Sequence, residues 1–154
     1  MTTPALRATP ELVAIAWLKG VVGDRVSTTL PKPGGDATIS WADGGFVTLT
    51  TTGGTPNLYV PLRDPVMGVD CWAVNPQSQK PPWNKAAALA AAIQAACWDH
   101  PAVPQRVTLP DGYPQAQVLS AYTTGDPRRI PDDPSSYARY MIPGLVIAWT
   151  EVAA

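Results

Sequence analysis

The chain has 154 residues, the length of one domain, so the sequence predicts a single domain over residues 1–154 without a separate cofactor module. Only 15% of the residues are charged and the formal net charge is −1, which argues against a basic face for nucleic acid. With 12 Gly, 18 Pro and 45% apolar residues, the composition indicates short elements joined by turns around a hydrophobic core.

The first predicted element is a helix that starts at Thr9-Pro10-Glu11. Thr is a good helix cap and Pro suits the first helical position. Leu12, Ile15 and Ala16 then fall on one face of the helix. We expect this short amphipathic helix to end at Gly20.

Thr- and Val-rich segments follow the helix and predict several strands. The second and third of them should form a hairpin across the turn Asp43-Gly44-Gly45. Arg63-Asp64-Pro65 either separates the last two or interrupts one strand, because Pro is awkward inside a central strand. The segments are 26–30, 37–42, 46–51, 58–62 and 66–74.

A second helix is predicted over residues 85–98, rich in Ala and ended by Pro101. Leu89, Ile93 and Cys97 recur at helical spacing, whereas the other faces carry Ala instead of charged residues. Such a helix is either buried within one subunit, or packs one face on the sheet and the other, kept small, against a neighbouring subunit. The second interpretation makes contact candidates of Ala87, Ala91 and Ala95.

Two strands, over 117–124 and 138–150, close the chain, and 107–109 could form a short edge strand. The order of elements predicts an α+β fold: a mainly antiparallel sheet with two helices packed on one face. The connection 125–137 is long for adjacent strands, and its charges suit either a subunit or tube contact or a solvated loop. The candidate contact residues are Arg128, Arg129, Asp132, Asp133, Tyr137 and Arg139.

No residue pattern indicates catalysis, so we expect no enzyme, no metal site and no cofactor site. Cys97 and His100 provide too few ligands for zinc, and His100 suits a helix end. The charge of Asp70 would raise the pKa of Cys71, which does not activate a thiol. Two cysteines are also too few for a disulfide framework, and both are expected to be reduced and buried.

The six tryptophans could serve either the core or a stacking surface. Trp17 and Trp98 fall on predicted helices and Trp72 and Trp149 in apolar strands, so most are expected in the core. Trp41 and Trp83 are left as candidates for exposure. Exposed Trp side chains in a row would indicate a carbohydrate-binding module.

No targeting or membrane segment is expected from the sequence. Arg7 is soon followed by Glu11, and the apolar stretch 12–18 is short, which makes a poor signal peptide. No run resembles a membrane span of about 20 apolar residues. We therefore expect synthesis in the cytoplasm and no membrane contact.

The element order and several short segments resemble those of one group of structural proteins. The segments are Trp17-Leu18, VSTTLP (26–31), PVMGVDCWA (65–73), the Ala-rich helix and PDDPSSYARY (131–140) before the last strand. Across most of its length the chain resembles the tail terminator, or tail completion, proteins of phages with long non-contractile tails, of the actinobacteriophage type. The Ala- and Pro-rich composition is typical of a high-GC genome.

This resemblance implies an α+β protein that forms a homo-hexameric ring on the tail tube, stops tube growth and presents a docking surface to the head-tail connector or stopper protein. It places the protein at the tail-neck junction of the virion, where genomic DNA passes the lumen without sequence-specific binding. No residue of known family function is matched. The alternatives are another phage neck component (a head completion or connector protein, or a tail tube subunit), a carbohydrate-binding module, and an enzyme using Cys97 and His100.

Overall fold

The structure, a computed structural model, describes residues 6–33, 35, 39–54, 58–77, 80–131 and 137–152. This part of the chain contains two helices, α1 (Pro10–Val22) and α2 (Trp83–Trp98), together with strands, which confirms the α+β class. The strands are β1 (Val26–Ser27), β2 (Phe46–Gly53), β3 (Leu62–Arg63), β4 (Val66–Ala73), β5 (Gln105–Val107), β6 (Ala116–Thr123), β7 (Arg128–Arg129) and β8 (Ala138–Glu151).

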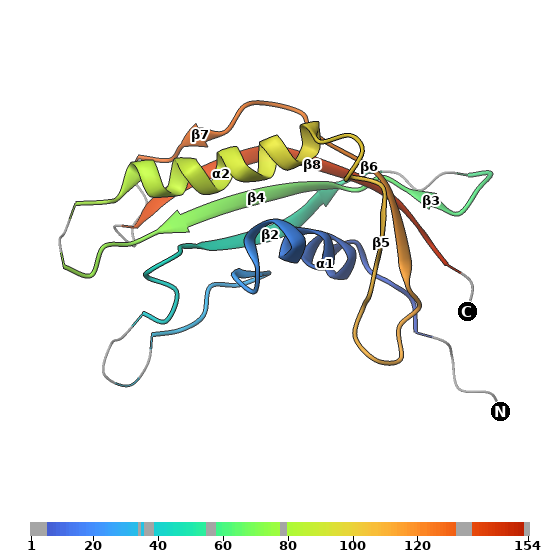
Figure 1. The fold of residues 1–154 in the computed structure, drawn as a ribbon, viewed down its shortest axis with the longest axis horizontal. Coiled ribbons are helices and arrows are strands. Elements are labelled where there is room, and N and C mark those ends of the chain that lie inside the picture. Colours follow the sequence, from blue (N-terminus) through green and yellow to red (C-terminus); the bar gives the residue numbers. More distant parts are fainter. Residues whose placement is uncertain are drawn as a thin grey trace.

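The strands form one curled sheet in the order β1-β2-β4-β8-β6-β5, with β3 and β7 also paired to β8 (Figure 1). Among the described strands only the β1–β2 pair is parallel, so the sheet is mainly antiparallel, as predicted. Register shifts interrupt the ladders that flank β8, between Met67 and Val69 in β4 and between Val118 and Ser120 in β6. Such irregularities bend a strand and increase its local twist, which suits the curled shape.

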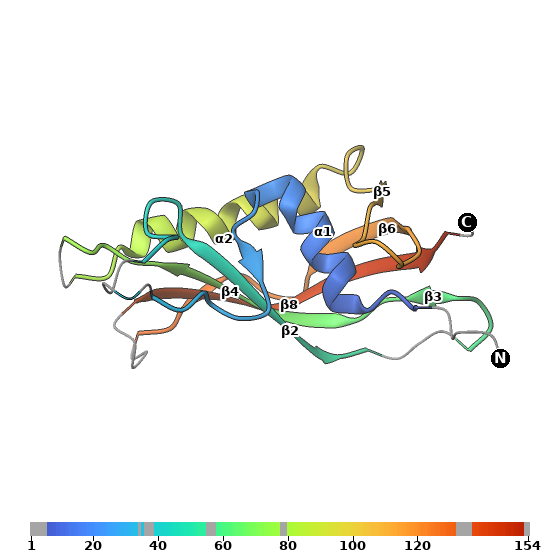
Figure 2. The same ribbon diagram turned by 90° about the horizontal axis from the view of Figure 1, so that it is seen from below.

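Both helices lie on the same face of this sheet (Figure 2), which confirms their predicted placement. The alternation of β4 shows the two faces: Met67, Val69, Cys71 and Ala73 are buried, and the residues between them are half-exposed. One continuous core lies between the helices and the sheet. Its members include Trp17 and Leu18 of α1, Leu89 and Ile93 of α2, and Ile142, Leu145, Ile147 and Trp149 of β8.

The first helix begins where its sequence predicts and ends slightly later. The Thr9 hydroxyl accepts a hydrogen bond from the backbone N–H of Leu12 (3.3 Å), and Pro10 is the first helical residue. The helix continues through Gly20 to Val22. Gly23 ends it at φ 73°, a conformation that glycine adopts without steric cost.

The other long elements also form close to their predicted positions. The second helix starts two residues before the predicted 85–98, and β4, β6 and β8 match the predicted strands within one residue at each end. The edge strand expected at 107–109 forms instead as β5, two residues earlier. It pairs with β6 through Gln105, Arg106 and Val107.

The predicted hairpin between 37–42 and 46–51 is wrong for the residues that the structure describes; residues 37 and 38 lie outside them. Residues 39–45 of this region contain turns, closed by a hydrogen bond from the Gly45 N–H to the Trp41 carbonyl (2.9 Å). Trp41 is buried and its ring packs against Phe46, with centroids 6.3 Å apart. Burial of this Trp in the turn takes the place of strand pairing, and β2 pairs with β4 and β1.

Two further strand predictions were too long. The segment predicted as 26–30 pairs only at Val26 and Ser27, and the segment 58–62 contributes to a strand only at Leu62. In the second case there are two strands, β3 and β4, but only Asp64-Pro65 separates them, because Arg63 belongs to β3. Residues 58–60 form bends before β3 instead of pairing.

The described helices give no membrane span: neither α1 nor α2 combines the length and the apolar character that a crossing helix needs.

Candidate assembly surfaces

The outward face of α2 is apolar and exposed. We call its exposed apolar residues, Ala88, Ala91, Ala92, Ala95 and Trp98, the outer stripe. They recur at helical spacing opposite the buried residues Leu89, Ile93 and Cys97. Of the sequence-predicted contacts, Ala91 and Ala95 lie in this stripe and Ala87 is half-buried beside it. Of the two interpretations of this helix, burial of all its faces within one chain does not hold, because the described residues cover only its inner face.

Charge is scarce along the outer stripe. Lys85, near the start of the helix, donates a hydrogen bond from Nζ to the Ala42 carbonyl (2.8 Å) and is half-buried. At the other end, Trp98 was expected in the core but is 66% exposed, and Asp99 follows it. An aromatic side chain exposed at the end of an uncharged helix face is unusual for a surface that faces only water.

A groove of about 590 Å³ lies beside this stripe, between α1 and α2. Its walls are mostly small and apolar, with Asp99 and Gln105 as the polar side chains. Trp17 is one of the lining residues; its Nε1 is buried and has no hydrogen-bond acceptor among the described residues. The remaining lining residues are Gly20, Val21, Ala92, Ala95, Ala96, Ala102 and Val103. We call this hollow the inter-helix groove.

Arg139 lies on the opposite face of the sheet, and its side chain contacts residues of the same chain. Its Nε donates to Oδ1 of Asp70 (2.8 Å), and its guanidinium lies 5.1 Å from the centroid of the Trp72 ring. Tyr137 meets Trp72 and Trp41 edge-on, at 6.5 and 5.3 Å between centroids. These two predicted contact residues thus form an intramolecular aromatic and ionic cluster.

The predicted loop 125–137 is not loop throughout, because Arg128 and Arg129 form β7 and pair with Met141 and Tyr140 of β8. Both Arg side chains are exposed, and the guanidinium of Arg129 lies 5.0 Å from the centroid of the Trp83 ring at the start of α2. Asp132 and Asp133 lie outside the described residues.

The structure divides the predicted contact residues between two faces. The α2 alanines and Arg129, through its contact with Trp83, belong to the helix-covered face. Tyr137 and Arg139 belong to the opposite face, because Trp72 points away from the buried side of β4. One continuous contact surface made of all these residues is therefore not present in a single subunit.

A third surface was missed from the sequence. Leu58, Tyr59 and Val60, which we call the arm tip, are 87%, 92% and 51% exposed. They precede β3 in the connection between β2 and β4, which reaches one end of the molecule's long axis (Figure 1). Their exposure was missed because they were predicted to lie in a strand, 58–62. Pro61, directly after the three apolar residues, is a signal against regular strand pairing.

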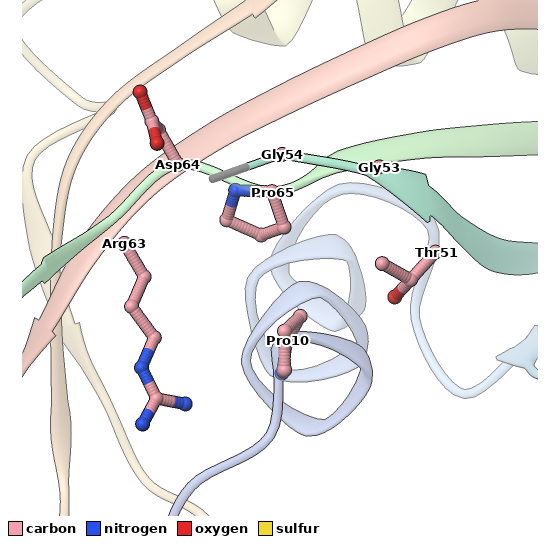
Figure 3. A pocket seen from close by; sticks show the side chains of 7 residues that line it. All are labelled: Pro10, Thr51, Gly53, Gly54, Arg63, Asp64 and Pro65. Atoms are coloured by element: carbon pink, nitrogen blue, oxygen red, sulfur yellow. The ribbon is translucent and has the colours of Figure 1, made fainter. Parts of the chain in front are cut away.

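A small hollow of about 240 Å³ marks the base of this connection (Figure 3). Pro10, Thr51 and Pro65 surround it and Arg63 lies along one side, while the Asp64 carboxylate points away. The volume is below the roughly 300–1,000 Å³ typical of small-molecule sites. We therefore interpret the hollow as a packing feature of the base and not as a ligand site.

The two thiols are free and buried, as predicted. Burial and, to a lesser degree, the charge of Asp70 raise the pKa of Cys71 to about 12, and burial raises the pKa of Cys97 to about 11. Both thiols therefore remain protonated at neutral pH, which is the opposite of what a nucleophile needs. His100, beyond the end of α2, is exposed, and the described residues include no group of three or more His, Cys, Asp or Glu side chains placed to hold a metal ion.

Comparison with known proteins gives no relative: no protein-family model matches the chain, and neither does any curated sequence.

Proposed function

We propose that this protein is a structural virion protein of a phage with a long non-contractile tail, where it caps the tail tube as a homo-hexameric ring. In this role it stops tube growth and provides the docking surface for the head-tail connector or stopper protein. The observation that carries the proposal is the uncharged outer stripe of α2, exposed in the single subunit beside the inter-helix groove. The class of assembly is proposed from the resemblance of the sequence to tail terminator proteins.

An exposed apolar helix face is stabilised when a second protein surface removes it from water, at about 25 cal/mol per Å² of apolar area. In a ring each subunit contacts its neighbours through two different surfaces. The outer stripe would provide one of them. Such an interface would join subunits without any reacting group, which agrees with a structural and not an enzymatic role.

The exposed charges of β7 suit a second kind of contact. Arg128 and Arg129 are presented on a paired strand, not on a free loop, so their positions are defined by β8. Charged residues at a contact set register and specificity more than affinity. We propose them as contacts to the tube protein or the connector.

The experiment that tests the proposal is disruption of the gene in the phage genome that carries it, followed by electron microscopy of the particles. A tail terminator predicts overlong, headless tails, and a plasmid copy of the wild-type gene should restore tails of normal length. Tails of normal length beside unjoined heads would instead assign the protein to the head side of the neck. Normal, infectious particles would reject both roles.

Native mass spectrometry of the purified protein tests the ring separately. The proposal predicts a species of six subunits, either alone or with tube protein added. A uniform stoichiometry other than six with tube protein present would contradict the hexamer.

A further inference from the structure

A hollow of about 320 Å³ lies between the end of α1, the turn that precedes β2 and the side of α2 that faces this turn. Its volume is within the range of roughly 300–1,000 Å³ that is typical of small-molecule sites. Two cations, Arg25 and Lys85, line it and are both half-buried. We call it the cationic hollow.

Backbone carbonyls hold both cations in defined positions. Nε of Arg25 donates a hydrogen bond to the Val22 carbonyl (3.0 Å), and Nη1 donates to the Gly44 carbonyl. Residue 44 must be a glycine, because a Cβ there would collide with the Arg25 guanidinium. Nζ of Lys85 donates to the Ala42 carbonyl (2.8 Å). The turn before β2 therefore places a guanidinium and an ammonium group at the same hollow.

Neither cation forms an ion pair within the part of the chain that the structure describes. Asp43 also lines the hollow, but its side chain is exposed and is paired with neither of them. A guanidinium has five N–H donors and an ammonium three, so the hydrogen bonds to the carbonyls leave further donors on both groups. These donors favour an anionic oxygen ligand, because hydrogen bonds between ionised groups are the strong ones.

The other walls of the cationic hollow are apolar. Val22, Ala88 and Leu89 line it, together with Val21 and Ala92. The last two residues also line the inter-helix groove, so the two depressions adjoin each other. A ligand that matches both kinds of wall has an anionic head and a short apolar chain.

We propose that the cationic hollow binds a small carboxylate with an apolar chain. The carboxylate lies between Arg25 and Lys85, and the chain lies along α2 toward the inter-helix groove. All the lining residues belong to a single subunit, so the inference does not rest on the proposed function or on ring formation.

The first test compares three probes by ligand-observed NMR with the full chain: hexanoate, acetate and hexylammonium. We expect saturable binding of hexanoate, more than about tenfold tighter than that of either other probe. Acetate has the anionic head without the chain, and hexylammonium has the chain with the opposite charge. No saturable binding of hexanoate, or equal binding of hexanoate and hexylammonium, would overturn the inference.

Three variants then test the assigned residues with hexanoate as the probe. Lys85→Gln should weaken binding at least about fivefold, because Gln can still donate to the Ala42 carbonyl but carries no charge. Lys19→Gln removes an exposed cation of α1 outside the hollow and should bind like the wild type. Asp43→Asn should strengthen binding about threefold, because it removes a like charge from the lining.

Thermal unfolding of each variant checks that the subunit is folded. The exposed Asp43 side chain keeps the test open even if the change at Lys85 alters the turn. An unchanged dissociation constant for a folded Lys85→Gln variant would overturn the inference, and so would weaker binding by Asp43→Asn. A loss of binding by Lys19→Gln equal to that of Lys85→Gln would do the same, because net charge alone would then explain the binding.

Discussion

The side chain of Arg139 makes its contacts within the same chain. It is joined to Asp70 by an ion pair and lies over the Trp72 ring, with the Arg and Asp side chains 28% and 22% exposed. We predict that Arg139→Lys lowers the free energy of unfolding by about 1 kcal/mol, because Lys keeps the charge but not the planar group that stacks on the ring.

Urea denaturation of the purified protein measures this change. The matched control is Arg106→Lys on the edge strand β5, where the Arg side chain is exposed, and its expected effect is below about 0.5 kcal/mol. Equal effects at both positions would show that the contact of Arg139 with the Trp72 side chain contributes nothing to the free energy of unfolding.

The buried thiols predict a loss of stability at alkaline pH. Above the ordinary thiol pKa of 9.0, Cys71 and Cys97 ionise in the unfolded chain, whereas their raised pKa values keep them protonated in the folded protein. The unfolded state then binds fewer protons, so the free energy of unfolding falls as pH rises. We expect a loss of about 1 kcal/mol for each thiol between pH 9 and pH 10.

Denaturant titrations at these two pH values measure the effect, with a double variant, Cys71→Ala and Cys97→Ala, as the comparison. The variant loses some packing at every pH, but its free energy of unfolding should fall less between the two pH values, because it lacks the two thiols. The other titrating groups are unchanged. The same decline in both proteins would contradict the prediction.

Single residues were predictable from the sequence only where local spacing decides their environment. Thr9 caps its helix, and Trp17 and Trp149 are in the core, as expected. Trp41 and Trp98 were placed wrongly because their exposure depends on distant contacts. Phe46 and Tyr137 cover Trp41, whereas no other element covers the end of α2 at Trp98 among the described residues.

At the scale of elements, the two faces of α2 can be separated by substitution. We predict that Ala91→Arg and Ala95→Arg, made singly, leave the free energy of unfolding nearly unchanged, because both positions are exposed, but weaken ring assembly. Ala90→Arg on the inner face, where the side chain is fully buried, should instead unfold the subunit.

Circular dichroism and native mass spectrometry distinguish these outcomes. Thr50→Arg, an exposed change on β2, controls for added charge. Assembly of both Ala variants at the wild-type concentration would reject the outer stripe as a subunit contact.

The elements that were predicted correctly have strong local signals. The Thr9 cap, Pro10 and spacing define α1, and Pro residues and spacing define α2. Apolar alternation defines β4, and a long, mostly apolar run defines β8. β7 was missed because Arg128 and Arg129 pair only with Met141 and Tyr140 of β8, which come 13 and 11 residues later in the chain. Of the candidate contacts, the helix alanines are exposed or beside exposed positions, but the role of Arg139 depends on Asp70, which is distant in the sequence.

At the scale of the molecule, salt can show which surface joins the subunits. The outer stripe carries no charged side chain, so we predict that NaCl between about 0.05 and 0.5 M changes the assembly constant less than about threefold. An interface built from Arg128, Arg129 and the acidic residues of the same connection would weaken strongly over this range, because salt screens exposed charges. Sedimentation velocity across the salt series measures the assembly constant. A strong decline of this constant with salt would assign the interface to β7 and not to α2.

Glu151, the last residue of β8, accepts hydrogen bonds from Nη1 of Arg7 (2.8 Å) and from the backbone N–H of Ala8 (3.1 Å), so residues from opposite ends of the sequence are side by side. Proteins with adjacent ends tolerate circular permutation. A short peptide could join Glu151 to Arg7, and the chain could be opened between Tyr59 and Val60. All strand pairs would then persist in a permuted protein whose new termini lie at the arm tip.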